Sequence, residues 1–140
     1  QIHGGARKAV YLYPREHYPL WVAELDRDLP YGQFGENFTV EGLLEGEIRE
    51  GDLLRTAGGV LLRVTEPRSP CYKLDIRMRM RDFGRRMIEN GRTGGYASVE
   101  SEGTVAAGDS IERVETDSAR PTVLQMHRAS YSPRADARGS

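Results

Sequence analysis

Short apolar stretches recur along this chain and predict β-strands. The most apolar stretch spans residues 60–65, and turns rich in glycine and aspartate separate several of the others. Residues 9–13 are also rich in strand formers, although they could instead open a helix. The remaining predicted strands span residues 38–40, 47–49, 53–56, 95–99 and 110–114.

Two segments place apolar residues at helical spacing, so both predict helices. The first spans residues 14–25, and the second spans residues 74–89 before an Asn90-Gly91 stop signal. Residues 123–127 suit either a helical turn or a strand. Many short strands with two inserted short helices predict a mostly β fold, barrel-like and built from mixed strands.

Composition narrows the class of protein. The 140 residues suit one domain, and the single cysteine cannot form an intramolecular disulfide, so a disulfide-framed secreted module is excluded. No stretch reaches the ~18 apolar residues of a membrane span, and no targeting leader is visible. The net charge of −1 argues against a nucleic-acid surface. We therefore expect a cytoplasmic protein that binds neither a membrane nor a nucleic acid polymer.

Charge is uneven along the chain although it is nearly balanced overall. Residues 71–92 hold seven basic and three acidic side chains, a balance of +4. Residues 93–118 hold six acidic side chains against Arg113 alone, a balance of −5. An anionic small molecule near the basic segment fits this asymmetry, and solvated helix and hairpin faces are the alternative.

The loop around Cys71 carries the clearest chemical signal. Pro67 and Pro70 should end the preceding strand and stiffen this loop, while Arg68 and Lys73 place cations on both sides of the cysteine. A thiolate is a soft metal ligand and a nucleophile, and nearby cations stabilise it. A buried structural cysteine is the alternative, because free cysteines are often buried.

Two further segments offer weaker binding signals. In residues 33–42, glycines allow close backbone approach, and Asn37 and Thr39 would share one strand face. Near the start, His3 and Lys8 flank a Gly-Gly pair whose amides could hold an anion. Ordinary turns explain both segments equally simply.

Several other kinds of site are excluded. Zinc-ligand spacing, a serine-hydrolase elbow, a phosphate-binding Walker loop and a dinucleotide fingerprint are all absent from the sequence. Nicotinamide binding by this chain is therefore not indicated.

Four segments in this order resemble the MOSC family, which is named for the C-terminal domain of molybdenum cofactor sulfurase. They span residues 3–18, 34–42, 67–74 and 91–96. The resemblance runs from residue 1 to about 114 and is closest to the YiiM-like subgroup, which is linked to resistance to N-hydroxylated base analogues.

The resemblance implies a β-barrel-like domain that binds the molybdopterin form of the molybdenum cofactor. Cys71 would supply the thiolate bound to molybdenum and, with Lys73, would form the catalytic pair. The residues expected to hold the cofactor or substrate are His3, Lys8, Asn37, Thr39, Arg68, Lys73 and Arg92. The implied reaction is the reduction of N-hydroxylated compounds, such as N-hydroxylated purine bases, with electrons from a separate flavin reductase.

Two alternatives of different classes stay open. Cys71 could carry a persulfide in a sulfur-carrier or sulfur-transfer domain, or the chain could be a non-catalytic cofactor-binding domain. Family members usually have strands before the segment that matches His3. We therefore expect residues 1–116 to form a MOSC domain without those strands, and residues 117–140 to form a C-terminal extension, either the start of a helical region or a disordered tail. A homodimer is one assembly the resemblance allows.

Overall fold

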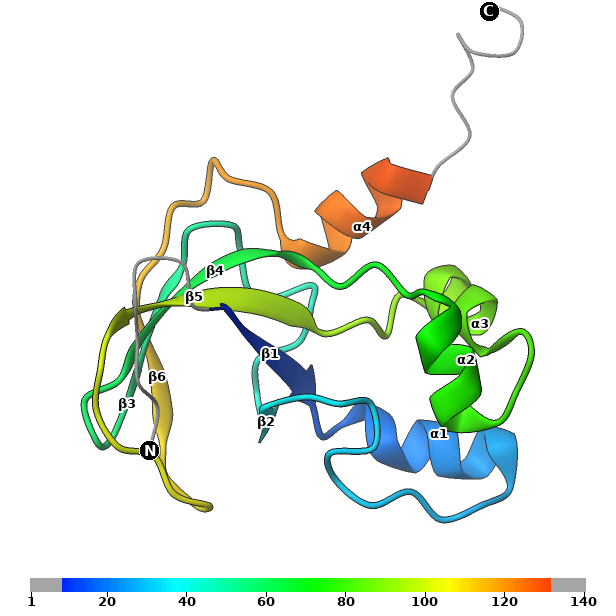
Figure 1. The fold of residues 1–140 in the computed structure, drawn as a ribbon. Coiled ribbons are helices and arrows are strands. Elements are labelled where there is room, and N and C mark those ends of the chain that lie inside the picture. Colours follow the sequence, from blue (N-terminus) through cyan, green and yellow to red (C-terminus); the bar gives the residue numbers. More distant parts are fainter. Residues whose placement is uncertain (1–8, 132–140) are drawn as a thin grey trace, which may run out of the picture.

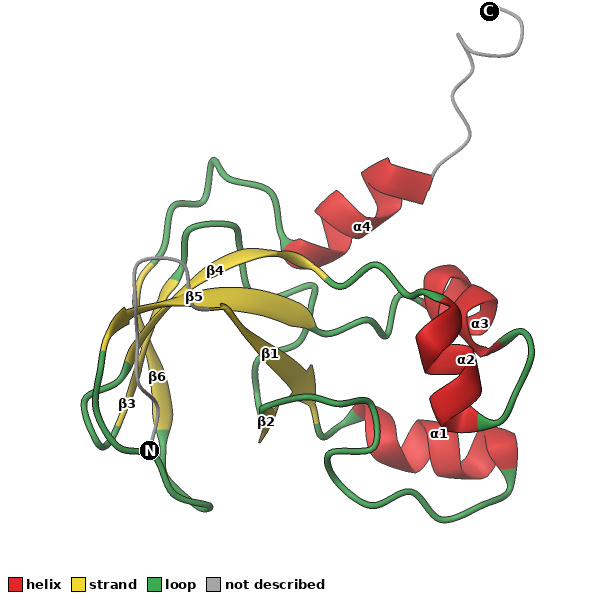
Figure 2. Cartoon of the chain, in the orientation of Figure 1, coloured by secondary structure: helices red, strands yellow, loops and turns green. Residues whose placement is uncertain are grey.

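The computed structural model describes residues 9–131, which form one curled sheet and four helices (Figures 1 and 2). The strands are β1 (Ala9–Pro14), β2 (Phe38–Val40), β3 (Leu53–Thr56), β4 (Leu61–Pro67), β5 (Gly95–Ser101) and β6 (Ile111–Glu115). The helices are α1 (His17–Leu25), α2 (Tyr72–Met78), α3 (Phe83–Asn90) and α4 (Val123–Tyr131).

The sheet has mixed pairing in the order β2-β1-β5-β4-β3-β6. Strands β1 and β2 are parallel, and every other neighbouring pair is antiparallel. The sheet curls until its edge strands border a common cleft of about 510 Å3, lined by residues of β2, residues 105–109 and Ile111. This half-barrel confirms the predicted barrel-like fold of mixed strands.

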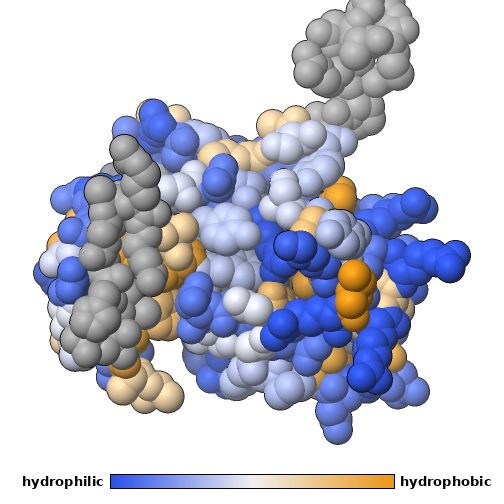
Figure 3. All heavy atoms as spheres, viewed as in Figure 1, coloured by the Kyte–Doolittle hydropathy of each residue, from blue (hydrophilic) through white to orange (hydrophobic). Residues whose placement is uncertain are grey.

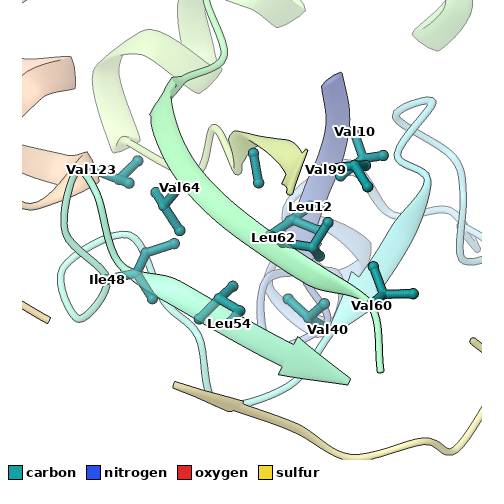
Figure 4. Close-up of a cluster of buried hydrophobic side chains, with 11 residues drawn as sticks. Val10, Leu12, Val40, Ile48, Leu54, Val60, Leu62, Val64, Val99 and Val123 are labelled. Atoms are coloured by element: carbon teal, nitrogen blue, oxygen red, sulfur yellow. The ribbon is translucent and has the colours of Figure 1, made fainter. Parts of the chain in front are cut away.

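One hydrophobic core lies inside the curl of the sheet. Leu62 and Val64 alternate with half-buried residues along β4, so both side chains point inward. Figure 4 shows them among side chains from the other strands, including Leu12 and Leu54. Burying each such side chain stabilises the fold by about 1.5–3 kcal/mol.

A second core lies between β1 and the helices. Tyr11 and Tyr13 alternate with the residues of β1 that face the first core, so this strand is buried on both faces. Trp21 of α1 packs in this second core, and its indole N–H donates to the hydroxyl of Tyr13 at 2.7 Å. Aromatic side chains thus anchor the helices to the sheet.

Two element predictions need correction, and a third segment that the sequence pattern leaves open is resolved. The predicted strand at 47–49 is a turn, because the carbonyl of Leu44 accepts hydrogen bonds from the amides of Glu47 and Ile48. The predicted helix at 14–25 begins only at His17, since Pro14 still belongs to β1. Residues 123–127, for which a helical turn and a strand were both open, belong to helix α4.

The predicted helix at 74–89 is two helices, so four helices replace the two predicted ones. Arg79 ends α2 in the left-handed region, with φ of 53°. Asp75 then bridges the break, because its carboxylate accepts the amide of Gly84 in α3 at 2.7 Å. The chain turns here without a glycine or proline, which is why the sequence pattern hid the break.

Helix α4 docks on the rest of the molecule. Val123 belongs to the first core, and a ring nitrogen of His127 lies 2.7 Å from the carbonyl oxygen of Ile88 in α3. The domain boundary after residue 116 stays a prediction. None of the helices within residues 9–131 is long and apolar enough to cross a membrane.

Candidate functional site

A cavity of about 390 Å3 opens where β1 meets α2. Its walls come from β1, the loop before β2, the loop after β4, the first turns of α2 and the start of β5. The lining residues are Ala9, Tyr11, Phe34, Gly35, Asn37, Arg68, Lys73, Leu74, Arg77 and Tyr96. The cavity therefore joins two of the segments that the sequence singled out, residues 33–42 and the Cys71 loop.

Arg68 is held in place on one side of this cavity. Its guanidinium lies over the ring of Tyr11, 4.8 Å from the centroid, and donates to the carbonyl oxygen of Phe34 at 2.6 Å. Burial raises the pKa of Tyr11 well above its usual range, so this hydroxyl stays neutral. It donates to the carbonyl of Thr93 at 2.7 Å. The arginine thus sits on a fixed aromatic support.

Asn37 connects the cavity wall to β1. Its side-chain oxygen accepts a hydrogen bond from the backbone amide of Tyr11 at 2.7 Å. Its backbone amide donates to the backbone carbonyl of Tyr11 at 2.9 Å. The side-chain oxygen is therefore occupied by the fold, while the side-chain NH2 is the group left to donate to a ligand.

The cavity is positively charged. Arg68, Lys73 and Arg77 line it, and among the described residues none of the three forms an ion pair with a carboxylate. Arg77 donates to the carbonyls of Gln33 and Gly32 instead. Because carbonyl bonds leave the charges uncompensated, the cavity favours an anionic ligand such as a phosphate.

Cys71 lies at the start of the helix that supplies Lys73 and Arg77. It caps α2, it is exposed, and it follows the end of β4 by four residues, as the two prolines predicted. The alternative of a buried structural cysteine is wrong. An exposed sulfur at the start of a helix that lines a cationic cavity can act as a ligand or a nucleophile.

The other predicted site residues lie elsewhere. Thr39 donates to Glu36 at 2.8 Å and lines the cleft between the sheet edges, away from Lys73. Arg92 packs over Trp21 and pairs with Glu24 of α1 at 3.3 Å, outside the cavity. His3 and Lys8 lie outside the described residues. The structure therefore brings Asn37, Arg68 and Lys73 into one cavity, and Cys71 precedes the helix that carries Lys73.

Sequence reasoning missed two residues that shape the site. Arg77 lies one helical turn after Lys73, and this spacing of four was a usable signal.

Glu36 is buried and accepts hydrogen bonds from Tyr18, Thr39 and two backbone amides of its own loop. Burial and the bond to Glu36 raise the pKa of Tyr18 above its usual range, so the tyrosine is the donor.

Gly94 fixes the loop behind Arg68. Its amide donates to buried Glu45 at 2.7 Å, and its carbonyl accepts the amide of Arg68 at 3.3 Å. Its φ is +67°, and a Cβ there would lie 2.8 Å from the ring of Tyr13. Gly32 has a similar φ of +88° but open space around its Cβ position, which makes it a matched control.

Gly94→Ala should therefore destabilise the protein more than Gly32→Ala. The positive φ should cost about 1 kcal/mol in both variants. Crowding should add about 1–3 kcal/mol at Gly94 alone. Urea denaturation measures both free energies of unfolding, and equal losses would contradict the close packing at Gly94.

Comparison with known proteins identifies the family. A family model described as MOSC domain matches residues 1–112. The chain is 38% identical to protein YiiM of Escherichia coli, over 81% of this chain and 52% of that protein, so it spans about half of YiiM. It is 36% identical to a Gibberella moniliformis protein named reductase, over 90% of this chain and 23% of that protein.

A solved structure agrees with this result. The crystal structure of YiiM from Geobacillus stearothermophilus superposes with a TM-score of 0.84 at 30% identity, over 88% of this chain and 63% of that one. The curled mixed sheet is therefore the MOSC-type fold that the motifs predicted. On the match of its sequence and of its fold, the chain belongs to the MOSC domain family.

Proposed function

We propose that this protein is a molybdenum-cofactor oxidoreductase that reduces N-hydroxylated compounds, such as N-hydroxylated purine bases. One observation carries the proposal: a cavity lined by three cations that no described carboxylate pairs, with the exposed Cys71 at the start of the helix that supplies two of them. The relative named reductase supports a redox role for this family member.

The donor set fits the molybdopterin form of the cofactor. Its phosphate would find the guanidinium groups of Arg68 and Arg77, whose planar donor sets suit phosphate oxygens. Cys71 would supply a soft sulfur ligand to the metal. Within residues 9–131 no cluster of three or more His, Cys, Asp or Glu could hold a metal. A metal at this site would therefore need most of its ligands from a cofactor and not from protein side chains, as in a metal–pterin complex.

The residues of the cavity suit the chemistry of N–O cleavage. Reducing an N–OH group consumes two electrons and two protons, breaks the N–O bond, and releases an amine and water. The bound cofactor would supply the electrons. Lys73 lines the cavity, and its ammonium is our candidate to donate a proton to the leaving oxygen, while the NH2 of Asn37 can orient the substrate. A separate flavin reductase would restore the electrons.

Turnover by the purified protein tests this proposal. We expect protein from a host that makes the cofactor to reduce an N-hydroxylated purine base with reduced methyl viologen as the electron source. The same chain from a host unable to make the cofactor should be inactive. Absence of turnover in cofactor-loaded protein would refute the assigned activity.

Exposure of Cys71 also suits sulfur transfer, the second candidate function. A persulfide on this cysteine would be accessible to a donor and an acceptor. Mass spectrometry that finds a reducible sulfur adduct on Cys71, without reduction of N-hydroxylated substrates, would favour it.

We also propose a cytoplasmic location, because a reducing compartment keeps an exposed thiol free. The homodimer stays a prediction.

A further inference from the structure

Helix α2 carries distinct stripes of side chains although it has only seven residues. Leu74 and Met78 are buried against the second core. Lys73 and Arg77 lie one turn apart and line the cavity. Two of its stripes are thus explained by the fold and by the proposed site.

The third stripe of α2 consists of Tyr72 and Ile76, which lie four residues apart and are each 68% exposed. At 100° per residue, this stripe lies next to the one that faces the cavity. Large exposed apolar side chains are ordinary when scattered, but two neighbours on one helix face form a patch. Covering each would gain about 1.5–3 kcal/mol before the costs of association.

Three exposed cations follow this patch, at the end of α2, in the α2–α3 loop and in α3. Arg79, Arg81 and Arg85 are exposed, and among the described residues no carboxylate forms an ion pair with them. The nearby acids are engaged within the fold, since Asp75 accepts the amide of Gly84 and Asp82 lies 3.9 Å from Arg86. In Figure 3, hydrophobic atoms over α2 lie among strongly hydrophilic ones.

Three exposed arginines elsewhere on the molecule are paired with carboxylates. Arg15, Arg55 and Arg120 each lie within 2.8 Å of a carboxylate oxygen. The α2–α3 face, defined as Tyr72, Ile76, Arg79, Arg81 and Arg85, therefore combines an apolar centre with an uncompensated positive rim. Tyrosine and arginine are the residues that dominate binding energy at protein interfaces.

We infer that the α2–α3 face docks an acidic, flavin-bearing protein that delivers electrons to the cavity. This inference rests on the proposed function. Charge complementarity names the partner's chemistry: carboxylates around its flavin would meet the arginines, and its apolar centre would cover Tyr72 and Ile76. Docking there places the donor on the helix that begins with Cys71, so reduced flavin is oxidised close to the proposed metal ligand.

A membrane or a nucleic acid is less suited to this face. A seven-residue helix with a single exposed isoleucine offers little area to a lipid surface. The exposed aliphatic side chain of Ile76 at the centre of the face would make no favourable contact with the phosphate backbone of a nucleic acid. Apolar side chains are common at the centre of protein–protein interfaces.

The test compares two variants that each remove three positive charges. Arg79→Gln/Arg81→Gln/Arg85→Gln neutralises the rim without touching the cavity. Arg15→Gln/Arg55→Gln/Arg120→Gln neutralises arginines outside the face and serves as the matched control. The probe is a reduced flavodoxin, an acidic flavoprotein, and calorimetry measures its binding while substrate reduction measures turnover.

At low ionic strength we expect the rim variant to lose about tenfold in affinity for flavodoxin and in flavodoxin-driven turnover. The control should lose less than about threefold. Added salt should reduce the differences in flavodoxin affinity among the wild type, the rim variant and the control. Turnover driven by reduced methyl viologen, a small radical cation that needs no docking, should stay unchanged. Ile76→Ser should weaken flavodoxin binding even at high salt.

Equal losses in both triple variants, or no binding of flavodoxin by the wild type, would overturn the inference. So would rim-dependent binding of anionic phospholipid vesicles or of duplex DNA in place of flavodoxin. If no protein turns over with viologen while flavodoxin binding still depends on the rim, the proposed activity fails and the docking surface stands.

Discussion

Cys71→Ala should lower the rate of N-hydroxylated purine reduction by at least about 100-fold, because it removes the only thiol in the sequence, which is the proposed ligand of the metal. The side chain is exposed, so the free energy of unfolding should change by less than about 0.5 kcal/mol. Viologen-driven turnover and urea denaturation of the same preparation measure the two effects.

Ser69→Ala is the matched control on the same loop. Its hydroxyl lies 3.0 Å from the hydroxyl of Tyr131 and offers no sulfur ligand, so activity should stay within about twofold of wild type. If Cys71→Ala keeps wild-type turnover, the sulfur is not part of the chemistry and the proposed role of Cys71 is wrong.

Glu36→Gln should cost about 3 kcal/mol of the free energy of unfolding, because it replaces a buried carboxylate that accepts four hydrogen bonds. Whichever way the new amide turns, its NH2 group meets a donor, since Phe34 donates to one oxygen and Tyr18 to the other. A buried donor without an acceptor is strongly destabilising.

The same substitution should also weaken ligand binding. Glu36 holds the loop whose carbonyls at Gly32 and Phe34 orient Arg77 and Arg68. Glu41→Gln is the control, because Glu41 forms only an exposed ion pair with Arg15, worth about 0–1 kcal/mol. Equal urea midpoints for the two variants would show that Glu36 does not brace the loop.

The strands were predictable where one face is buried and the pattern alternates, as in β4. Strand β1 was ambiguous between strand and helix because Val10 and Leu12 face one core while Tyr11 and Tyr13 face the other. A strand buried on both faces has no alternation to detect. The break between α2 and α3 at Arg79 was also hidden from the sequence pattern. It is bridged by a tertiary hydrogen bond, in which the carboxylate of Asp75 accepts the amide of Gly84.

The candidate site was predictable where a single segment carries it. Arg68, Cys71 and Lys73 are close in sequence, and a strand end followed by a helix start keeps them close in space. Thr39 and Arg92 show the limit of such reasoning, because the motif does not reveal that Thr39 donates to Glu36 or that Arg92 pairs with Glu24 of α1. Arg77 and Tyr11 needed the fold, since only the sheet brings β1 against α2.

The central claim is that the cavity holds a molybdenum cofactor through Cys71. Elemental analysis of protein purified from a cofactor-making host tests this claim most directly. Wild-type protein should contain near-stoichiometric molybdenum, and Cys71→Ala should retain less than about a tenth of it. Wild-type protein without molybdenum, or equal molybdenum in the two proteins, would contradict it.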